Sequence, residues 1–184
     1  MLIKEKTRRE VEEKLKSLGD FVKIDYLTSC LKQQVDFDTR KFVLLQLSKL
    51  YEDKKMFVEA GKMIELAANI NTTFQNQIND FLKAAELFVK GGDFDKADKS
   101  FEKALVAGNT VEKVMIKHRR KEIYIQQAEF YLKNDRRNHA ALSYERLLSF
   151  DLDILEKKKV QEKLLNLYEK LGKIRDYYSL KRIM

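Results

Sequence analysis

The chain has 184 residues, of which 44% are hydrophobic and 36% are charged, and its net charge is +8. A single cysteine excludes a disulfide framework within the chain, and the absence of proline lets helix follow helix without interruption. No apolar run approaches the ~20 residues that span a bilayer, and residues 1–19 lack the apolar centre of a signal peptide, so we expect a cytoplasmic protein.

Apolar side chains recur with helical spacing along the whole chain, and no alternating strand pattern occurs. Short polar or glycine-containing breaks divide this pattern into about five pairs of helices. The first pair has the break Leu18-Gly19-Asp20-Phe21, which resembles the later break Gly92-Asp93-Phe94. The predicted pairs are residues 5–38, 39–77, 78–110, 111–153 and 154–184.

The middle three pairs share one pattern, in which an alanine follows an aromatic residue at i+9 and a bulky residue follows at i+13. A small residue at this position lets the two helices of a hairpin approach closely. The triplets are Tyr51-Ala60-Ile64, Phe88-Ala97-Phe101 and Tyr131-Ala140-Tyr144. The breaks near the two ends place Ile24 and Tyr177 where the alanine would be, which fits atypical terminal repeats.

The fourth pair is longer than the others. The alanine positions 97 and 140 are 43 residues apart, whereas the other spacings are 36 or 37. The extra residues extend a helix that runs from Val111 through Arg119 to Leu132, with Thr110 as its expected N-cap.

These positions resemble the tetratricopeptide repeat family, a helix-turn-helix repeat of ~34 residues. In the second pair, the family's large, aromatic, small and apolar positions are Leu44, Tyr51, Phe57, Ala60 and Ile64. No proline follows any second helix, which departs from the family pattern. The predicted fold is a single all-α domain, a right-handed superhelical array (an α-solenoid) of about five antiparallel helix-turn-helix repeats.

The resemblance implies a concave groove lined by the first helix of each repeat, suited to a peptide or helix of a partner. Leu45, Leu82 and Ile125 form its apolar floor, or alternatively pack between neighbouring hairpins. The predicted groove residues are Phe42, Leu45, Lys49, Asn79, Leu82, Glu86, Glu122, Ile125 and Glu129, continued in the fifth pair by Lys159, Glu162 and Asn166.

Basic residues cluster in the second half of the chain. They could bind RNA phosphates or an anionic membrane surface, or they could form a solvated helix face. Exposed aromatics for base stacking are not evident, because the nearby tyrosines hold core positions. The candidate anion-binding residues are Lys117, Arg119, Arg120, Lys121, Arg136, Arg137, Lys157, Lys158 and Lys159.

Catalytic and metal-binding motifs are missing from the sequence. The two histidines, His118 and His139, have no partner ligand at metal-binding spacing, and Cys30 lies on a helix without a neighbouring base motif. We therefore expect no enzyme activity, no metal and no cofactor. The predicted function is a non-catalytic scaffold or adaptor for a protein partner, with docking on RNA or a ribonucleoprotein as the alternative. Self-association through the terminal helices, including residues 177–184, remains a third reading.

Overall fold

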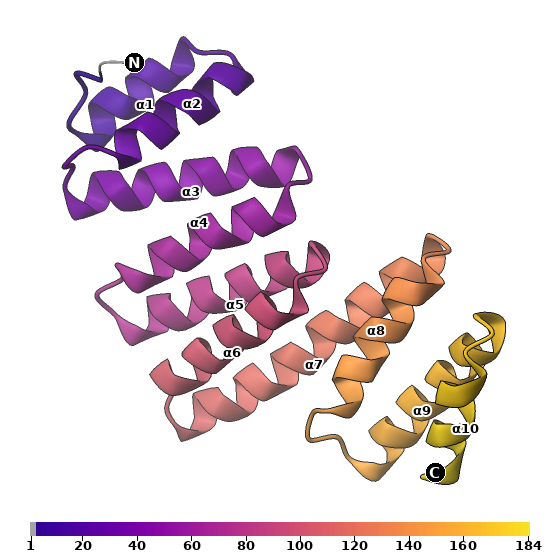
Figure 1. Ribbon diagram of the computed structural model, residues 1–184. Helices are drawn as coiled ribbons and strands as arrows, with labels where there is room; N and C mark the ends of the chain where they lie inside the picture. Colours follow the sequence, from indigo (N-terminus) through magenta and orange to yellow (C-terminus); the bar gives the residue numbers. More distant parts are fainter. Residues whose placement is uncertain (1–2) are drawn as a thin grey trace. The chain divides into compact units, whose positions relative to one another are not determined.

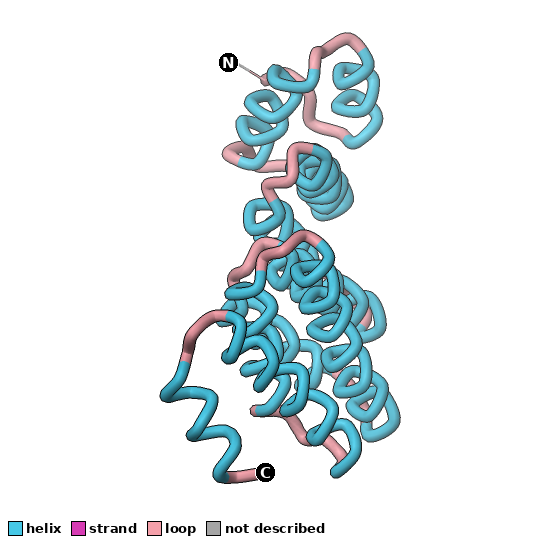
Figure 2. Tube along the Cα trace, turned by 90° about the vertical axis from the view of Figure 1, so that its right-hand side faces the viewer, coloured by secondary structure: helices cyan, strands magenta, loops and turns pink. Residues whose placement is uncertain are grey.

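The computed structural model describes residues 3–184, which form ten helices and no strand (Figures 1 and 2). The prediction of an all-α fold in which consecutive helices pack against each other is confirmed; the right-handed superhelix stays a prediction. The helices are α1 (Arg8–Lys16), α2 (Asp20–Leu31), α3 (Phe37–Asp53), α4 (Phe57–Asn69), α5 (Phe74–Lys90), α6 (Phe94–Ala107), α7 (Thr110–Lys133), α8 (Arg137–Leu148), α9 (Ile154–Lys170) and α10 (Ile174–Arg182).

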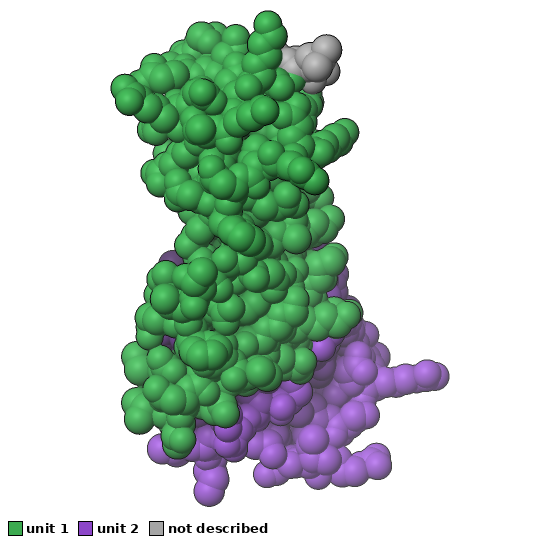
Figure 3. All heavy atoms as spheres, turned by 90° about the vertical axis from the view of Figure 1, so that its left-hand side faces the viewer, with its two compact units in different colours: residues 1–116 green, residues 117–184 purple. Residues whose placement is uncertain are grey.

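The chain divides into two compact units, residues 1–116 and 117–184, called here unit 1 and unit 2 (Figure 3). Their boundary falls inside α7. The ten helices follow the order of the five predicted pairs, although α3 begins at Phe37 and α5 at Phe74, before the predicted boundaries at 39 and 78. The prediction that these pairs form one domain stays a prediction.

Four hairpins end their first helix with the same turn. A residue with positive φ follows the helix in each: Lys55 (59°), Gly92 (78°), Asp135 (53°) and Gly172 (67°). The next backbone N–H then donates to the carbonyl of an aromatic residue five positions earlier, which is the long bond of a Schellman motif. These bonds are Met56 to Tyr51 (2.8 Å), Asp93 to Phe88 (2.9 Å), Arg136 to Tyr131 (2.8 Å) and Lys173 to Tyr168 (2.9 Å).

The first hairpin does not share this turn. Gly19 has a φ of −75° and is the N-cap of α2, whereas Gly92 has a φ of +78° and ends α5. The predicted equivalence of these two glycines is therefore wrong at the level of the backbone, because Gly19 starts a helix and Gly92 terminates one.

Small residues bring the helices close together. Ala60, Ala97 and Ala140 are fully buried, as their place in the repeat predicts. The buried Ser48 hydroxyl of α3 donates to the Ala60 carbonyl of α4 at 3.1 Å, so the facing position on the first helix is small as well. Packing between hairpins is equally tight, since a Cβ on Gly61 would lie 2.9 Å from two ring carbons of Phe88 in α5.

Helix α7 has 24 residues, whereas α3, α5 and α9 each have 17. The predicted long helix is confirmed, but its predicted N-cap is wrong. The Asn109 side chain, not that of Thr110, accepts the Glu112 N–H at 3.0 Å. The Glu112 carboxylate accepts the Asn109 N–H in return at 2.8 Å, which completes a reciprocal cap.

Candidate functional site

The first helices of unit 2, α7 and α9, lie side by side and are joined by two ion pairs. Lys121 Nζ on α7 lies 2.7 Å from Glu156 Oε2 on α9, and Lys163 Nζ on α9 lies 3.2 Å from Glu129 Oε1 on α7. The lysine belongs to α7 in the first pair and to α9 in the second, so the two pairs together favour one register of the two helices along this face. We call this surface the first-helix face of unit 2.

One hollow of this face, the Tyr144 hollow, has a volume of about 400 Å³. Its lining residues come from α7, from α8, from the loop between α8 and α9, and from α9 itself. Most of the exposed lining is apolar, supplied by Ile125, Leu152, Val160 and the tyrosine ring. The lining residues are Ile125, Tyr144, Leu152, Glu156, Lys159, Val160, Glu162 and Lys163.

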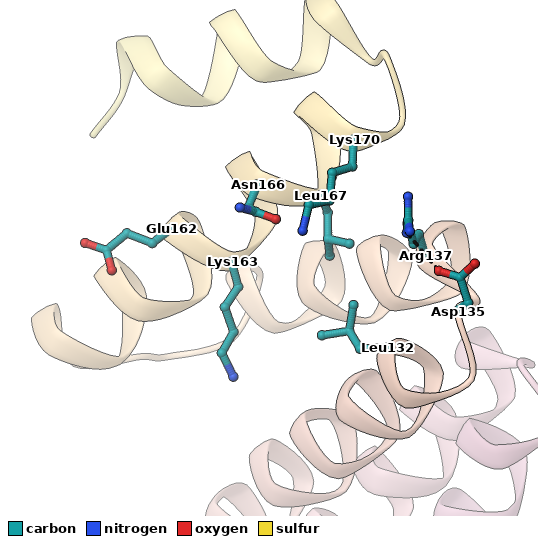
Figure 4. A pocket seen from close by; sticks show the side chains of 8 residues that line it. All are labelled: Leu132, Asp135, Arg137, Glu162, Lys163, Asn166, Leu167 and Lys170. Atoms are coloured by element: carbon teal, nitrogen blue, oxygen red, sulfur yellow. Dashed lines mark ion pairs between the residues drawn. The ribbon is translucent and has the colours of Figure 1, made fainter.

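A second hollow, the Leu132 hollow, has a volume of about 520 Å³ and lies at the turn between α7 and α8. Leu132 and Leu167 point toward one another across it, and an ion pair joins Arg137 to Asp135 at 2.9 Å (Figure 4). Its lining residues are Leu132, Asp135, Arg137, Glu162, Lys163, Asn166, Leu167 and Lys170. Because the two hollows share Glu162 and Lys163, they adjoin along α9 and form one groove.

The charges in the groove are held in defined states by their partners. Hydrogen bonds from the Lys121 ammonium and from the Asp153 N–H lower the pKa of the Glu156 carboxyl. Burial raises the pKa of the Tyr144 phenol, against the opposing effect of the Lys163 ammonium. That ammonium lies 5.5 Å from the centroid of the Tyr144 ring. The Tyr144 hydroxyl itself is buried, and the Lys163 ammonium is a charged group that interacts with it.

Unit 1 has a hollow at the equivalent place between α1 and α3, with a volume of about 420 Å³. Four of its lining residues occupy the repeat positions of residues that line the Leu132 hollow. Gln46, Lys49, Leu50 and Asp53 correspond in this way to Lys163, Asn166, Leu167 and Lys170. The groove is thus a repeated feature of the first-helix faces, although its side chains differ between the two units.

The structure brings about half of the predicted groove residues to these hollows. Phe42 and Lys49 line the hollow of unit 1, although Phe42 is a core residue that is only 9% exposed. Ile125 lines the Tyr144 hollow. From the fifth pair, Lys159, Glu162 and Asn166 all line the groove of unit 2.

The remaining predicted groove residues have other surroundings. Leu45 is 36% exposed and Asn79 is exposed, but Leu82 packs against a core cluster that contains Phe81 and Ile116, which supports the packing reading of that leucine. Three acidic residues are engaged in ion pairs, namely Glu86 with Lys90 (2.8 Å), Glu122 with Arg119 (3.3 Å) and Glu129 with Lys163 (3.2 Å).

The predicted basic residues fall into two groups. Lys121, Arg119 and Arg137 pair with carboxylates, and the Arg120 guanidinium stacks 4.0 Å from the centroid of the Phe150 ring. The other group is exposed and makes no ion pair among the described residues. This second group consists of Lys117, Arg136, Lys157, Lys158 and Lys159.

Sequence reasoning missed Tyr144, Leu132 and Lys163 as parts of a binding surface. Tyr144 was assigned to the core, which is correct for its hydroxyl, while part of the residue forms the hollow's wall. The sequence did carry a signal for Leu132, because it is an apolar residue directly after Tyr131, the aromatic of the repeat. In the structure Leu132 is 38% exposed and does not belong to the core.

The described residues were predicted to hold no metal site and no reactive thiol, and three findings concern those groups and the membrane. Residues 3–184 contain no group of three or more histidine, cysteine, aspartate or glutamate side chains arranged to hold a metal ion. Cys30 is buried, and burial raises the pKa of its thiol, so the nucleophilic thiolate is disfavoured. Among the described helices, none has the length and apolar character that crossing a membrane requires.

No protein-family model matches the chain, and no curated protein matches it at a significant level. Among solved structures, the chain is similar to the crystal structure of BtubC (BKLC) from P. vanneervenii. The sequence identity is 18%, the match covers 93% of this chain and 74% of that chain, and the TM-score is 0.38. A likeness at this level carries no argument about function.

Proposed function

We propose that this protein is a non-catalytic scaffold that binds a peptide or helix of a protein partner on the first-helix face of unit 2. The observation that carries the proposal is the groove made by the two adjoining hollows along α9. Apolar side chains lie in both hollows, Leu132 and Leu167 in one and Ile125, Leu152 and Val160 in the other, and charged side chains accompany them, which suits an amphipathic segment. A cytoplasmic location belongs to the same proposal.

The tetratricopeptide-like character of the chain is also a proposal. It is supported by four Schellman turns that each follow an aromatic residue, and by the buried alanine nine positions after three of these aromatics. In such arrays the first helices supply the binding surface, because the second helices cover their other side.

The test is a substitution that fills the groove without touching the core. Leu132→Arg with Asn166→Arg places two long charged side chains in the Leu132 hollow, and both residues are exposed. Leu142→Arg with Asn138→Arg is the matched control, because it makes the same exchanges at exposed positions of α8. Partners are captured from a cell lysate with each variant and with the wild type, after circular dichroism has shown equal helix content.

We expect a discrete protein partner that the wild type and the α8 control retain and that the groove variant loses. A partner that binds a folded groove variant as well as it binds the wild type would contradict the assignment of the binding face.

Docking on RNA or a ribonucleoprotein is the second candidate, favoured by the distribution of charge. Residues 117–184 carry 17 basic and 10 acidic side chains, a net charge of +7, whereas residues 1–116 carry 20 and 19. If RNA is the ligand, the logarithm of its affinity should fall steeply with the logarithm of salt concentration, and replacing Lys157, Lys158 and Lys159 should flatten that slope. A flat salt response in the wild type would remove this candidate.

A further inference from the structure

The Tyr144 hollow combines an apolar interior with charged lining residues of both signs, namely Glu156, Glu162, Lys159 and Lys163. Ile125, Leu152 and Val160 line its interior together with Tyr144. It opens on the first-helix face, where Lys159 and Lys163 belong to its lining. A large apolar side chain of a partner that entered the hollow would remove this lining from water. The free energy gained on binding would scale with the apolar area buried.

The carboxylates of the hollow are largely neutralised by partners within unit 2. Glu156 is paired with Lys121, and Glu129, which lies next to the hollow, is paired with Lys163. Glu162 is the remaining lining carboxylate, and Lys159 is one helical turn away from it on α9.

Three exposed lysines lie at the start of α9. Lys157, Lys158 and Lys159 follow one another on its first turns and make no ion pair among the described residues, and Lys159 is the one that lines the hollow. Asp151 and Asp153 lie in the turn before them, so the excess of positive charge comes from unit 2 as a whole. The net charge of +7 on unit 2 adds a longer-range attraction for an anionic partner.

We infer that the Tyr144 hollow receives a large apolar side chain from an acidic segment of a protein partner, whose carboxylates lie against Lys157, Lys158 and Lys159. The inference rests on the proposed function and gives the chemistry of the partner segment: at least one leucine, methionine or aromatic anchor flanked by aspartates or glutamates. The apolar anchor distinguishes this ligand from a nucleic acid, which would use the lysines but not the hollow.

A display library of random short peptides, selected on the full-length chain, tests the inference. We expect the selected peptides to share one large apolar residue with acidic neighbours. Replacing that apolar residue by serine, or the acidic residues by their amides, should each weaken binding at least about tenfold in fluorescence anisotropy. A selection that yields no peptides, or peptides without acidic enrichment, would overturn the inference.

Two protein variants separate these three lysines of α9 from the remaining basic charge of unit 2. Lys157→Gln with Lys158→Gln and Lys159→Gln should weaken binding of the selected peptides about tenfold. Arg175→Gln with Lys181→Gln and Arg182→Gln removes the same charge from exposed positions of α10 and should change binding little. Equal losses in both variants would mean that only net charge matters, and the assignment to the hollow would fail.

The inference and the proposed function fail in different ways. A partner that is lost only from the groove variant, but whose binding segment carries no acidic residues, would leave the scaffold function standing and overturn the inference. Single-stranded RNA that displaces the selected peptides without needing Ile125 or Tyr144 would point to the lysines alone and would also overturn it.

Discussion

The residues that end the first helices show how one backbone geometry tolerates different side chains. Gly92 and Gly172 adopt positive φ without a steric penalty, whereas Lys55 and Asp135 adopt it with a Cβ that crowds the backbone. The repeat therefore constrains the conformation at this position more strongly than it constrains the residue type.

Lys55→Gly should raise the free energy of unfolding by about 1 kcal/mol, because glycine removes the penalty of the left-handed conformation. Gly172→Ala should lower the free energy of unfolding by a similar amount, because φ at this position is +67° and alanine is strained there. A new methyl group would meet nothing within 4 Å, so the backbone conformation alone causes the loss. Chemical denaturation followed by circular dichroism measures both. A Lys55→Gly protein no more stable than the wild type would contradict the backbone explanation.

The ion pair of Glu156 should make the free energy of unfolding depend on pH. The pKa of Glu156 is lowered in the folded protein, so its contribution is present above the ordinary glutamate pKa of 4.5 and is lost as the pH falls through the lower folded value. The side chain is 37% exposed, and we expect an effect of no more than about 1 kcal/mol. Glu156→Gln should flatten the fall in unfolding free energy below pH 4.5, measured by denaturation at several pH values. An unchanged acid profile would show that the Lys121 contact contributes nothing.

At the level of single residues, the sequence predicted the buried alanines and the aromatic positions, because a period of fixed length constrains them directly. It could not predict that Asn109 caps α7 in place of Thr110, because both residue types are good caps and their choice depends on where the chain leaves α6. The role of Tyr144 was equally hidden, since a core position and the wall of a hollow have the same pattern.

Among the elements, the contact between α4 and α5 depends on a missing side chain. A Cβ on Gly61 would lie 2.9 Å from Phe88 Cδ1 and Cε1 and 3.2 Å from the Ala84 carbonyl oxygen. The ring of Phe88 is fully buried and cannot move away without opening the core. This glycine therefore sets the distance between the second and third hairpins.

Gly61→Ala should lower the free energy of unfolding by about 1–3 kcal/mol through overpacking. Gly19→Ala is the comparison variant, because a Cβ at Gly19 would have nothing within 4 Å and the only expected loss is the preference of the N-cap for glycine over alanine. The two variants are compared by thermal and urea unfolding. If Gly61→Ala and Gly19→Ala had equal free energies of unfolding, α4 and α5 could move apart at little cost and the overpacking explanation would be wrong.

The pairing of the elements was largely predictable, but the surfaces they form were not. Each break between helical runs lies where the structure has a turn, because glycine, asparagine and charged residues interrupt the apolar pattern there. The hollows depend on side chains from three helices, and no pattern within one helix indicates how much space they leave. Leu82 illustrates the difficulty, since an apolar residue at a groove position packs against the core instead.

Across the whole molecule, buried apolar cores occur in both units, but the net charge is concentrated in one of them. Most of the net charge belongs to unit 2, whereas both units have fully buried apolar cores. In an array, each hairpin draws its stability mainly from its neighbours, so damage in one place should remain local.

Leu164→Ala in α9 removes a side chain that is 1% exposed and should cost about 2–5 kcal/mol within unit 2. Native-state hydrogen exchange should then accelerate more in α8, α9 and α10 than in α3 to α6. Leu87→Ala in α5, which removes a fully buried leucine of unit 1, should give the reverse pattern. Uniform acceleration in both variants would show that the chain opens as one cooperative body.

The recurring Schellman turn has a consequence for how such a chain can change in length. Lys55 and Gly92 have the same backbone conformation and lie 37 residues apart, so residues 56–92 form a cassette whose two ends match. The tight contact between Gly61 and Phe88 lies inside this cassette. A tandem copy inserted after Gly92 would bring its own hairpin contacts with it, and the number of hairpins is therefore not limited by a closed core.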